Sequence, residues 1–193
     1  MATTRAEKVE ETRARLIAAA RRAFATQGYA GASMDELTAE AGLTRGALYH
    51  NFGDKKGLLQ AVVDQIDAEM LVRMRAAGQG ASAWDAFVEE GVAYVEMALE
   101  PEIQRIMLLD GPSVLGDPSS WPNQTACLRT TTQTIQGLID EGVVKTVDAE
   151  AAARLVNGAA LNAALWIAAA DSPEAVLEKA VEAFRHMVSG LRA

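Results

Sequence analysis

The sequence has 193 residues and a formal net charge of -8, and 50% of its residues are hydrophobic while only 5% are aromatic. This apolar content suffices for a buried core, and abundant alanine with few aromatic residues favours an all-α protein over a sheet. The single cysteine, Cys127, excludes an internal disulfide and a cysteine metal cluster, and the start of the chain lacks the pattern of a secretory signal. We therefore expect a cytoplasmic protein.

Helical periodicity extends through most of the chain and predicts helices separated by short connections. They cover residues 8–26, 33–42, 44–52, 55–74, 83–99, 101–110, 123–141, 148–170 and 172–191, while residues 111–120 read as an irregular segment. Gly28 ends the first helix, and Ser33 with Glu36 has the spacing of a capping box at the start of the second. The pattern predicts about nine helices and no strand.

The most apolar run lies in residues 155–170, and it contains Asn157 and Asn162. It is shorter than the roughly 20 apolar residues that a membrane span needs. We expect a packed helix there and no membrane partner.

The charge is distributed unevenly along the chain. Residues 1–60 contain nine Lys/Arg and seven Asp/Glu, whereas residues 61–193 contain nine Lys/Arg and nineteen Asp/Glu. Attraction to phosphate depends on the local surface rather than on the chain average, so an acidic total does not exclude nucleic acid. The asymmetry predicts two parts with different partners.

The second and third helices are only about two turns long and are joined through Gly42, as in a helix-turn-helix. Their apolar residues are spaced to face the first helix: Leu37, Ala41, Leu43, Leu48 and Phe52. The residues left facing outward are Thr44, Arg45, Gly46, Tyr49 and His50. Arginine can donate two hydrogen bonds to guanine, and a glycine allows the helix to approach the bases closely, so this pattern predicts DNA binding.

At this point the chain resembles the TetR family of transcriptional regulators. The resemblance rests on residues 28–63, GYAGASMDELTAEAGLTRGALYHNFGDKKGLLQAV. The sequence departs from the family at Thr38, where an alanine is frequent, and at Asn51, where an aromatic residue or histidine is frequent. The resemblance implies a three-helix DNA-binding domain at residues 1–55, followed by a ligand-binding and dimerisation domain at residues 56–193.

The resemblance also assigns roles to single residues of the motif. It implies that Thr44, Arg45 and Gly46 approach bases, that Tyr49 and His50 contact the DNA backbone, and that Lys55 and Ser33 contact phosphates. Each has a simpler alternative: Thr44 as a helix cap, Arg45 and His50 as solvated side chains, and Tyr49 as half-buried packing.

In the family, a two-fold dimer binds a near-palindromic operator, usually represses, and leaves the DNA when a small molecule enters the C-terminal domain. An activator, a dual regulator and a regulator that responds to a protein partner remain as alternatives. A helical enzyme is a remote one, because no residues with catalytic, cofactor or metal spacing stand out. The operator sequence and the identity of the effector stay open.

Large apolar residues and one amide of the C-terminal half form the candidate effector pocket. They are Trp84, Phe87, Tyr94, Met97, Met107, Trp121, Asn162 and Trp166. For each of these, ordinary core packing is the alternative. The last two helices, with an alanine-rich face and an apolar stripe, suit a homodimer interface of four helices.

Overall fold

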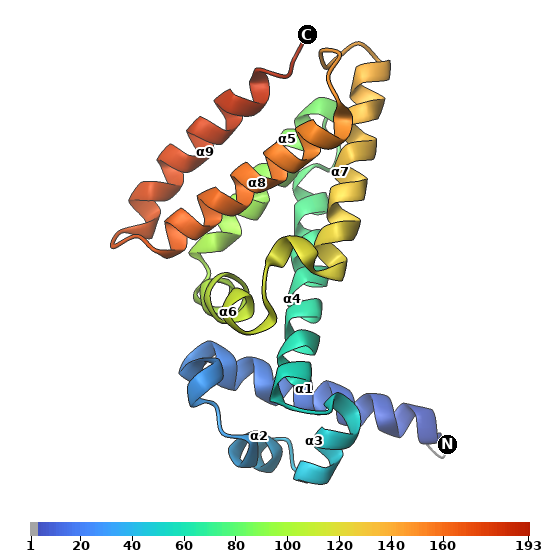
Figure 1. The fold of residues 1–193 in the computed structure, drawn as a ribbon, viewed down its shortest axis with the longest axis vertical. Helices are drawn as coiled ribbons and strands as arrows, with labels where there is room; N and C mark the ends of the chain where they lie inside the picture. The colour runs from blue at the N-terminus through green and yellow to red at the C-terminus, as the bar shows by residue number, and fades with distance from the viewer. Residues whose placement is uncertain (1–3) are drawn as a thin grey trace. The chain divides into compact units, whose positions relative to one another are not determined.

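The computed structural model describes residues 4–193, and within that range the chain is α-helical with no strand (Figure 1). The helices are α1 (Arg5–Gly31), α2 (Met34–Glu40), α3 (Arg45–Phe52), α4 (Lys55–Ala77), α5 (Ala83–Glu96), α6 (Gly111–Leu115), α7 (Pro122–Asp140), α8 (Ala149–Ala168) and α9 (Pro173–Ser189). Short 3-10 helices cover Met97–Leu99 (η1) and Pro118–Ser120 (η3), and Ile103–Asp110 (η2) is a π-helix. The expected all-α class and about nine helices are confirmed for the described residues.

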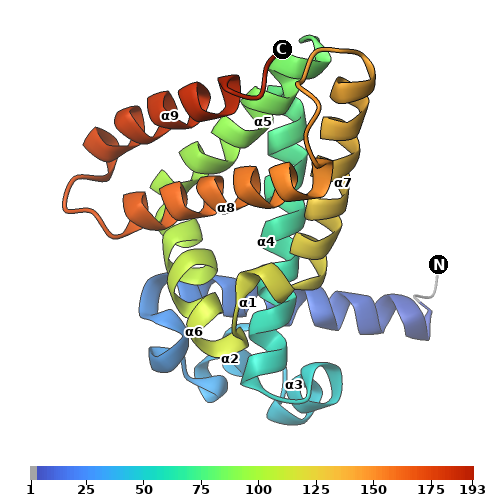
Figure 2. The same cartoon turned by 45° about the horizontal axis from the view of Figure 1, so that its top comes forward.

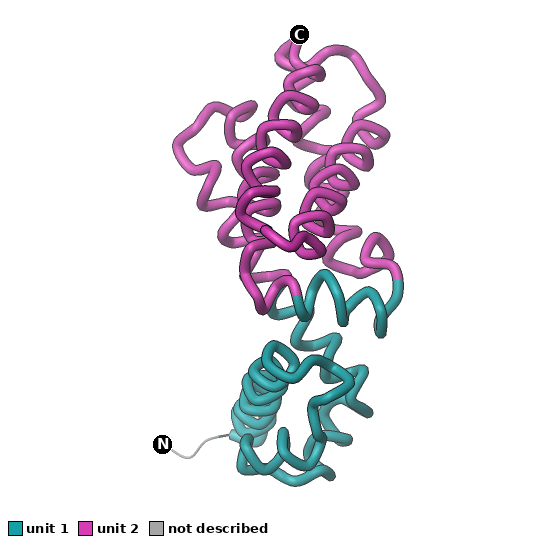
Figure 3. The backbone as a smooth tube through the Cα atoms, turned by 90° about the vertical axis from the view of Figure 1, so that its left-hand side faces the viewer, with its two compact units in different colours: residues 1–66, 105–116 teal, residues 67–104, 117–193 magenta. Residues whose placement is uncertain are grey.

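The chain divides into two compact units (Figure 3). The first unit contains the described residues up to Ile66 together with Arg105–Gly116, and the second contains Asp67–Gln104 and Asp117–Ala193. The functional boundary expected after residue 55 falls inside the first unit. The first half of α4 belongs to the first unit because its apolar residues, including Leu58 and Leu59, are fully buried there.

In the first unit, α2 and α3 pack on one face of α1. This face carries the buried residues Leu16, Ala20 and Phe24 of α1, against which the short helices bury Leu37 and Leu48. Helices of seven and eight residues are unstable alone in water, so this shared core holds them. Thr38 is buried as well, and its hydroxyl donates to the carbonyl of Met34 at 3.0 Å. The departure from alanine at this position thus leaves no unsatisfied polar group.

A break in α1 lies at Gly28, where the sequence predicts that the helix ends. Its φ of 74° and ψ of 167° are not helical, although the helix resumes as far as Gly31. Such backbone angles are open almost only to glycine. The guanidinium of Arg105, in the same unit, occupies the space that a side chain at this position would need.

The second unit is a helical bundle in which α8 packs against α5, α7 and α9. Helices α8 and α9 lie side by side and are joined by a short turn (Figures 1 and 2). Trp84, Val92 and Val95 of α5 are among its buried residues, as are Ile135 of α7 and Phe184 of α9. Small alanines on the inner face of α8 allow the neighbouring helices to approach closely.

Two expectations from the sequence are wrong. Residues 111–120 are not irregular throughout, because α6 and η3 form within them, with Pro112 and Pro118 placed in first turns where proline is tolerated. The expectation that the apolar run is too short for a membrane span also fails, since α8, which lies within the predicted helix 148–170, has 20 residues and is long and apolar enough to cross a membrane by length and composition. A core helix of a soluble protein passes the same test, and α8 packs within the second unit.

Candidate nucleic-acid interface and effector cavity

Helix α3 begins at a side-chain cap. Thr44 has extended backbone angles, and its Oγ1 accepts a hydrogen bond from the backbone N–H of Ala47 at 3.2 Å. Gly42 makes the preceding turn with a φ of 63°, a left-handed conformation that favours glycine. The cap predicted for Thr44 is confirmed, and Leu48 fixes the helix to the core because its side chain is fully buried.

The residues of α3 and its N-cap to which the family resemblance assigns DNA contacts all lie on the outer face of this helix. Thr44, Arg45, Gly46, Tyr49 and His50 are all exposed, and 47% of the Tyr49 surface is open to solvent. Apart from the backbone of α3 and the neighbouring residues, only Oγ1 of Thr44 lies within 4 Å of the position that a Cβ at Gly46 would occupy. The N-terminal half of α3 therefore presents a flat, accessible surface flanked by hydrogen-bond donors.

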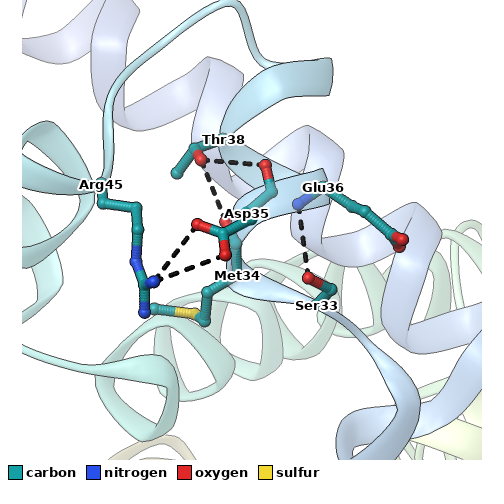
Figure 4. A network of polar contacts seen from close by, with 6 residues as sticks. All are labelled: Ser33, Met34, Asp35, Glu36, Thr38 and Arg45. Carbon is teal, nitrogen blue, oxygen red and sulfur yellow. Dashed lines mark hydrogen bonds and ion pairs between the residues drawn. The ribbon is translucent and has the colours of Figure 1, made fainter.

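Arg45 is held by Asp35, a residue to which the family resemblance assigns no role (Figure 4). Its Nη1 lies 3.2 Å from Oδ1 and 3.4 Å from Oδ2 of Asp35, in the first turn of α2. Both distances involve one guanidinium nitrogen, so the Asp35 pair leaves the Nη2 side of the fork available to another acceptor. The Tyr49 hydroxyl and then the Asp35 carboxylate raise the pKa of Arg45, which keeps it charged.

Ser33 caps α2 at the other end of the same network (Figure 4). Its Oγ accepts from the backbone N–H of Glu36 at 3.5 Å, a long hydrogen bond. The cap predicted for Ser33 is therefore present at α2, where only this half of the capping box forms. A capping box with both hydrogen bonds lies at the start of α1, between Thr4 and Glu7. Ser33 is half-buried, with its hydroxyl at the N-terminal end of α2.

Lys55, at the start of α4, is half-buried and lies over an aromatic ring. Its Nζ is 4.7 Å from the centroid of Tyr29, and burial lowers its pKa while the Asp110 carboxylate opposes that shift. Asp110 also accepts from the backbone N–H of Tyr29 at 2.6 Å and from Nε of Arg105 at 3.1 Å. Lys55 is thus a cation that lies over the Tyr29 ring, in the field of the Asp110 carboxylate.

Several basic residues of α1 serve the fold. Arg13 donates to the carbonyl of Asn51 at 3.1 Å and stacks 4.6 Å from the Phe52 ring, and Arg15 donates to the carbonyl of Ala41 at 2.6 Å. These contacts satisfy carbonyls near the C-terminal ends of α2 and α3. Together with Asp35, they are the residues that sequence reasoning missed. Only their charge and the helix ends could have pointed to them.

A cavity of about 220 Å³ lies within the second unit. Helix α5 lines it with one face, Phe87, Glu90, Gly91 and Tyr94, and α7 does so with Gln124, Cys127, Leu128 and Thr131. Helix α8 closes it with residues including Arg154, Asn157, Gly158 and Leu161. Most of the wall is apolar and a few polar groups converge on it, as in sites for small organic molecules.

Two of the eight candidate effector residues, Phe87 and Tyr94, line this cavity. Trp84, Met97 and Trp121 are buried elsewhere in the second unit, and the indole N–H of Trp121 has no hydrogen-bond partner in the described part of the chain. Met107 belongs to the first unit. Asn162 and Trp166 lie on the exposed side of α8, where half of the Trp166 surface is open.

Cys127 is half-buried at the wall of the cavity. Burial, the largest cause, raises the pKa of its thiol, so the reactive thiolate is disfavoured. Within residues 4–193 no group of three or more His, Cys, Asp or Glu side chains is placed to hold a metal ion.

Comparison with known proteins assigns both parts of the chain. Residues 16–62 match the family model described as bacterial regulatory proteins, tetR family, and residues 84–191 match the tetracyclin repressor-like C-terminal domain. The crystal structure of a TetR-family transcriptional regulator from Pectobacterium atrosepticum is 50% identical, with a TM-score of 0.88 over 98% of each chain.

The chain matches less than two thirds of the length of its curated relatives SrpR and AcnR. The HTH-type transcriptional regulator SrpR of Pseudomonas putida is 46% identical over 63 residues, which are 33% of this chain and 30% of SrpR. The HTH-type transcriptional repressor AcnR of Corynebacterium glutamicum is 29% identical over 110 residues, or 57% of this chain and 58% of AcnR. These matches are to transcriptional regulators and not to enzymes. The chain belongs to the TetR family of DNA-binding transcriptional regulators.

Proposed function

We propose that this chain is a repressor that binds a near-palindromic operator as a homodimer and leaves it when a small molecule occupies the cavity of the second unit. The observation that carries this proposal is the pairing, in one chain, of an exposed recognition face on α3 with an apolar cavity of about 220 Å³. The relative AcnR, which is named a repressor, supports the sign of the regulation.

For DNA, the proposed division of roles follows the exposed face of α3. Arg45, with one side of its guanidinium uncommitted to Asp35, reads a guanine, and Thr44 and Gly46 allow close approach to the bases. Tyr49 and His50 contact the phosphate backbone from the same face. Ser33 and Lys55 contact phosphates on either side, and these contacts position the helix without reading sequence.

The homodimer interface proposed for α8 and α9 is supported by apolar side chains that the single chain leaves exposed. On α8 the exposed fractions are 74% for Leu155, 37% for Leu165 and 51% for Trp166, and on α9 Met187 is 47% exposed. Neighbouring apolar residues exposed on two helices favour burial against a symmetric copy. A two-fold dimer would place one recognition helix at each half-site, about 34 Å apart along the DNA.

Coupling between effector and DNA is proposed to use the segments that continue from one unit into the other. Helix α4 contributes Lys55 to the first unit and Met74 to the wall of the cavity in the second. The segment 105–116 belongs to the first unit but is continuous at both ends with the second. An effector that changes the arrangement of α4 or of this segment changes the spacing of the two recognition helices, and so the fit to the operator. As a regulator of a bacterial chromosome, the protein would act in the cytoplasm.

The test starts from selection of bound sequences out of a random DNA pool. A palindrome with half-sites about one turn apart supports the dimeric operator. A thermal-shift screen of small molecules then supplies ligands of the free protein, and each ligand is added to the protein–operator complex. Release of operator by a ligand supports the proposal, whereas ligands that stabilise the protein and leave the complex intact contradict it. A reporter gene behind the selected operator gives the sign of regulation.

A further inference from the structure

The cavity of the second unit contains a carboxylate without a counter-charge. Glu90 lines the cavity from α5, one turn from Phe87 and from Tyr94. Its side chain is half-buried, and it makes no hydrogen bond or ion pair with any other residue of the described range, 4–193. A partly desolvated carboxylate is stabilised by a cation or by hydrogen-bond donors, so Glu90 is the natural polar anchor for a bound molecule.

The cationic residue at the cavity wall does not offset this charge. Arg154 of α8 lines the cavity, but its Nε and Nη2 lie 3.0 and 2.8 Å from Oε1 of Glu150, one helical turn earlier. Its side chain is 62% exposed and points a charged group toward solvent-accessible surface. An anionic ligand would have to share the Arg154 guanidinium with Glu150, and would still meet the field of Glu90.

A second carboxylate strengthens the negative field. Asp67, on α4, accepts a hydrogen bond from Nε2 of Gln124, a cavity residue, at 3.4 Å. The Asp67 charge acts on two other cavity residues. Burial is the main cause that raises the pKa of Tyr94, and the Asp67 charge is the second; the same charge also contributes to the raised pKa of Cys127. Both groups therefore stay protonated and neutral, so neither Tyr94 nor Cys127 adds a charge.

The remaining wall is apolar and the space is small. Phe87, Leu128, Leu161 and Phe184 supply most of the hydrophobic surface, and the volume of about 220 Å³ lies below the roughly 300–1,000 Å³ of pockets for drug-sized ligands. The cavity thus suits one ring or a short branched chain rather than a large polycyclic molecule.

We propose that the effector of this regulator is a compact apolar amine, whose ammonium group pairs with Glu90 while its hydrocarbon part fills the space between α5, α7 and α8. The inference rests on the proposed role of the cavity as the effector site. Opposite charges within a partly desolvated wall attract strongly, and a carboxylate-bearing molecule of the same size is repelled there.

Three probes of matched size test the charge preference: benzylamine, benzyl alcohol and benzoate. We measure their binding to the full chain without DNA, by calorimetry and by thermal shift up to millimolar concentration. Benzylamine should bind at least about tenfold more tightly than benzyl alcohol, as expected for one added hydrogen bond between charged groups, and benzoate should bind weakest. Equal binding of all three, tighter binding of benzoate, or no binding of any probe overturns the inference.

Two variants locate the anchor. Glu90→Gln keeps the shape of the side chain and removes its charge, so it should lose the preference for benzylamine and keep the affinity for benzyl alcohol. Glu96→Gln removes an equal charge from an exposed position of the same helix and should bind all probes like the parent. If Glu90→Gln retains the preference, the assignment is wrong. If Glu90→Gln unfolds, as its circular dichroism would show, the ranking of the probes on the parent chain decides.

Release of the operator DNA is measured separately from binding of the probes to the free protein. Benzylamine that binds as expected but leaves the operator complex intact supports the ligand class and contradicts the effector role. Operator release by benzoate or benzyl alcohol, without release by benzylamine, supports the effector role and overturns the amine.

Discussion

Replacing Arg45 by alanine should change which DNA sequences the protein prefers and leave the fold nearly intact. The side chain is half exposed and its ion pair with Asp35 lies at the surface, where such pairs contribute little to stability. A two-bond contact between arginine and guanine, by contrast, accounts for about 5- to 140-fold discrimination at one base pair.

In the proposed dimer the free-energy loss doubles, because each half-site loses one contact and distant sites add. Even the lower limit gives about 25-fold weaker binding to the operator. The loss cannot exceed the ratio between specific and non-specific affinity, roughly 10³ to 10⁷, since non-specific binding remains. The variant should therefore bind the operator worse and random DNA almost as before.

The assay is fluorescence anisotropy with the selected operator and with operators that carry each base substitution in turn. Arg22→Ala is the matched control, because Arg22 forms an exposed ion pair with Glu40 at 2.6 Å, away from α3. Arg45→Ala should become indifferent to one position per half-site, and Arg22→Ala should not. If both variants lose affinity equally for all sequences, Arg45 acts only through its charge and the assignment to a base is wrong.

Three further changes have outcomes that the structure determines. Lys55→Ala should weaken binding to all sequences and reduce the slope of log affinity against log salt by about 0.9 per protomer, whereas an unchanged slope would make this lysine purely structural. Gly28→Ala should lower the free energy of unfolding in urea by about 1–3 kcal/mol, because φ is 74° and the new Cβ would collide with the Arg105 guanidinium; an unchanged midpoint would contradict this. The Arg185 guanidinium holds the pKa of Glu89 below its ordinary value, so the stabilisation is present above the unfolded pKa and is lost as pH falls through the folded one. The difference in unfolding free energy between the parent and Arg185→Gln, below about 1 kcal/mol for this partly exposed pair, should therefore shrink between about pH 5 and pH 3; a constant difference would refute it.

The short helices of the first unit could be predicted because their signals are local. Thr44 and Ser33 stand at helix starts where a side-chain oxygen is needed, and Gly42 supplies the left-handed turn between them. The spacing of Leu37 and Leu48 fixes which face is buried. Each signal needs only a few neighbouring residues, so no knowledge of distant contacts was required.

The cavity of the second unit was predictable only in part, because periodicity identifies apolar faces without saying what covers them. Helix α8 carries small buried residues such as Ala153 and Ala160 on one side, and larger exposed ones such as Leu155 and Trp166 on the other. Sequence reasoning placed Trp166 in a pocket, whereas the single chain exposes it. The cavity forms where side chains of α5, α7 and α8 fail to fill the space between them, and that depends on helix crossings that no local pattern encodes.

Polar contacts between residues far apart in the sequence escape prediction for a related reason. Asp110 accepts the Tyr29 N–H from 81 positions away and also influences Lys55, yet in the sequence it reads as an unremarkable carboxylate at the end of an apolar segment. Because 105–116 belongs to the first unit, the part that binds DNA is not a continuous stretch of sequence. A boundary drawn after residue 55 or residue 66 omits the carboxylate that satisfies the C-terminal part of α1.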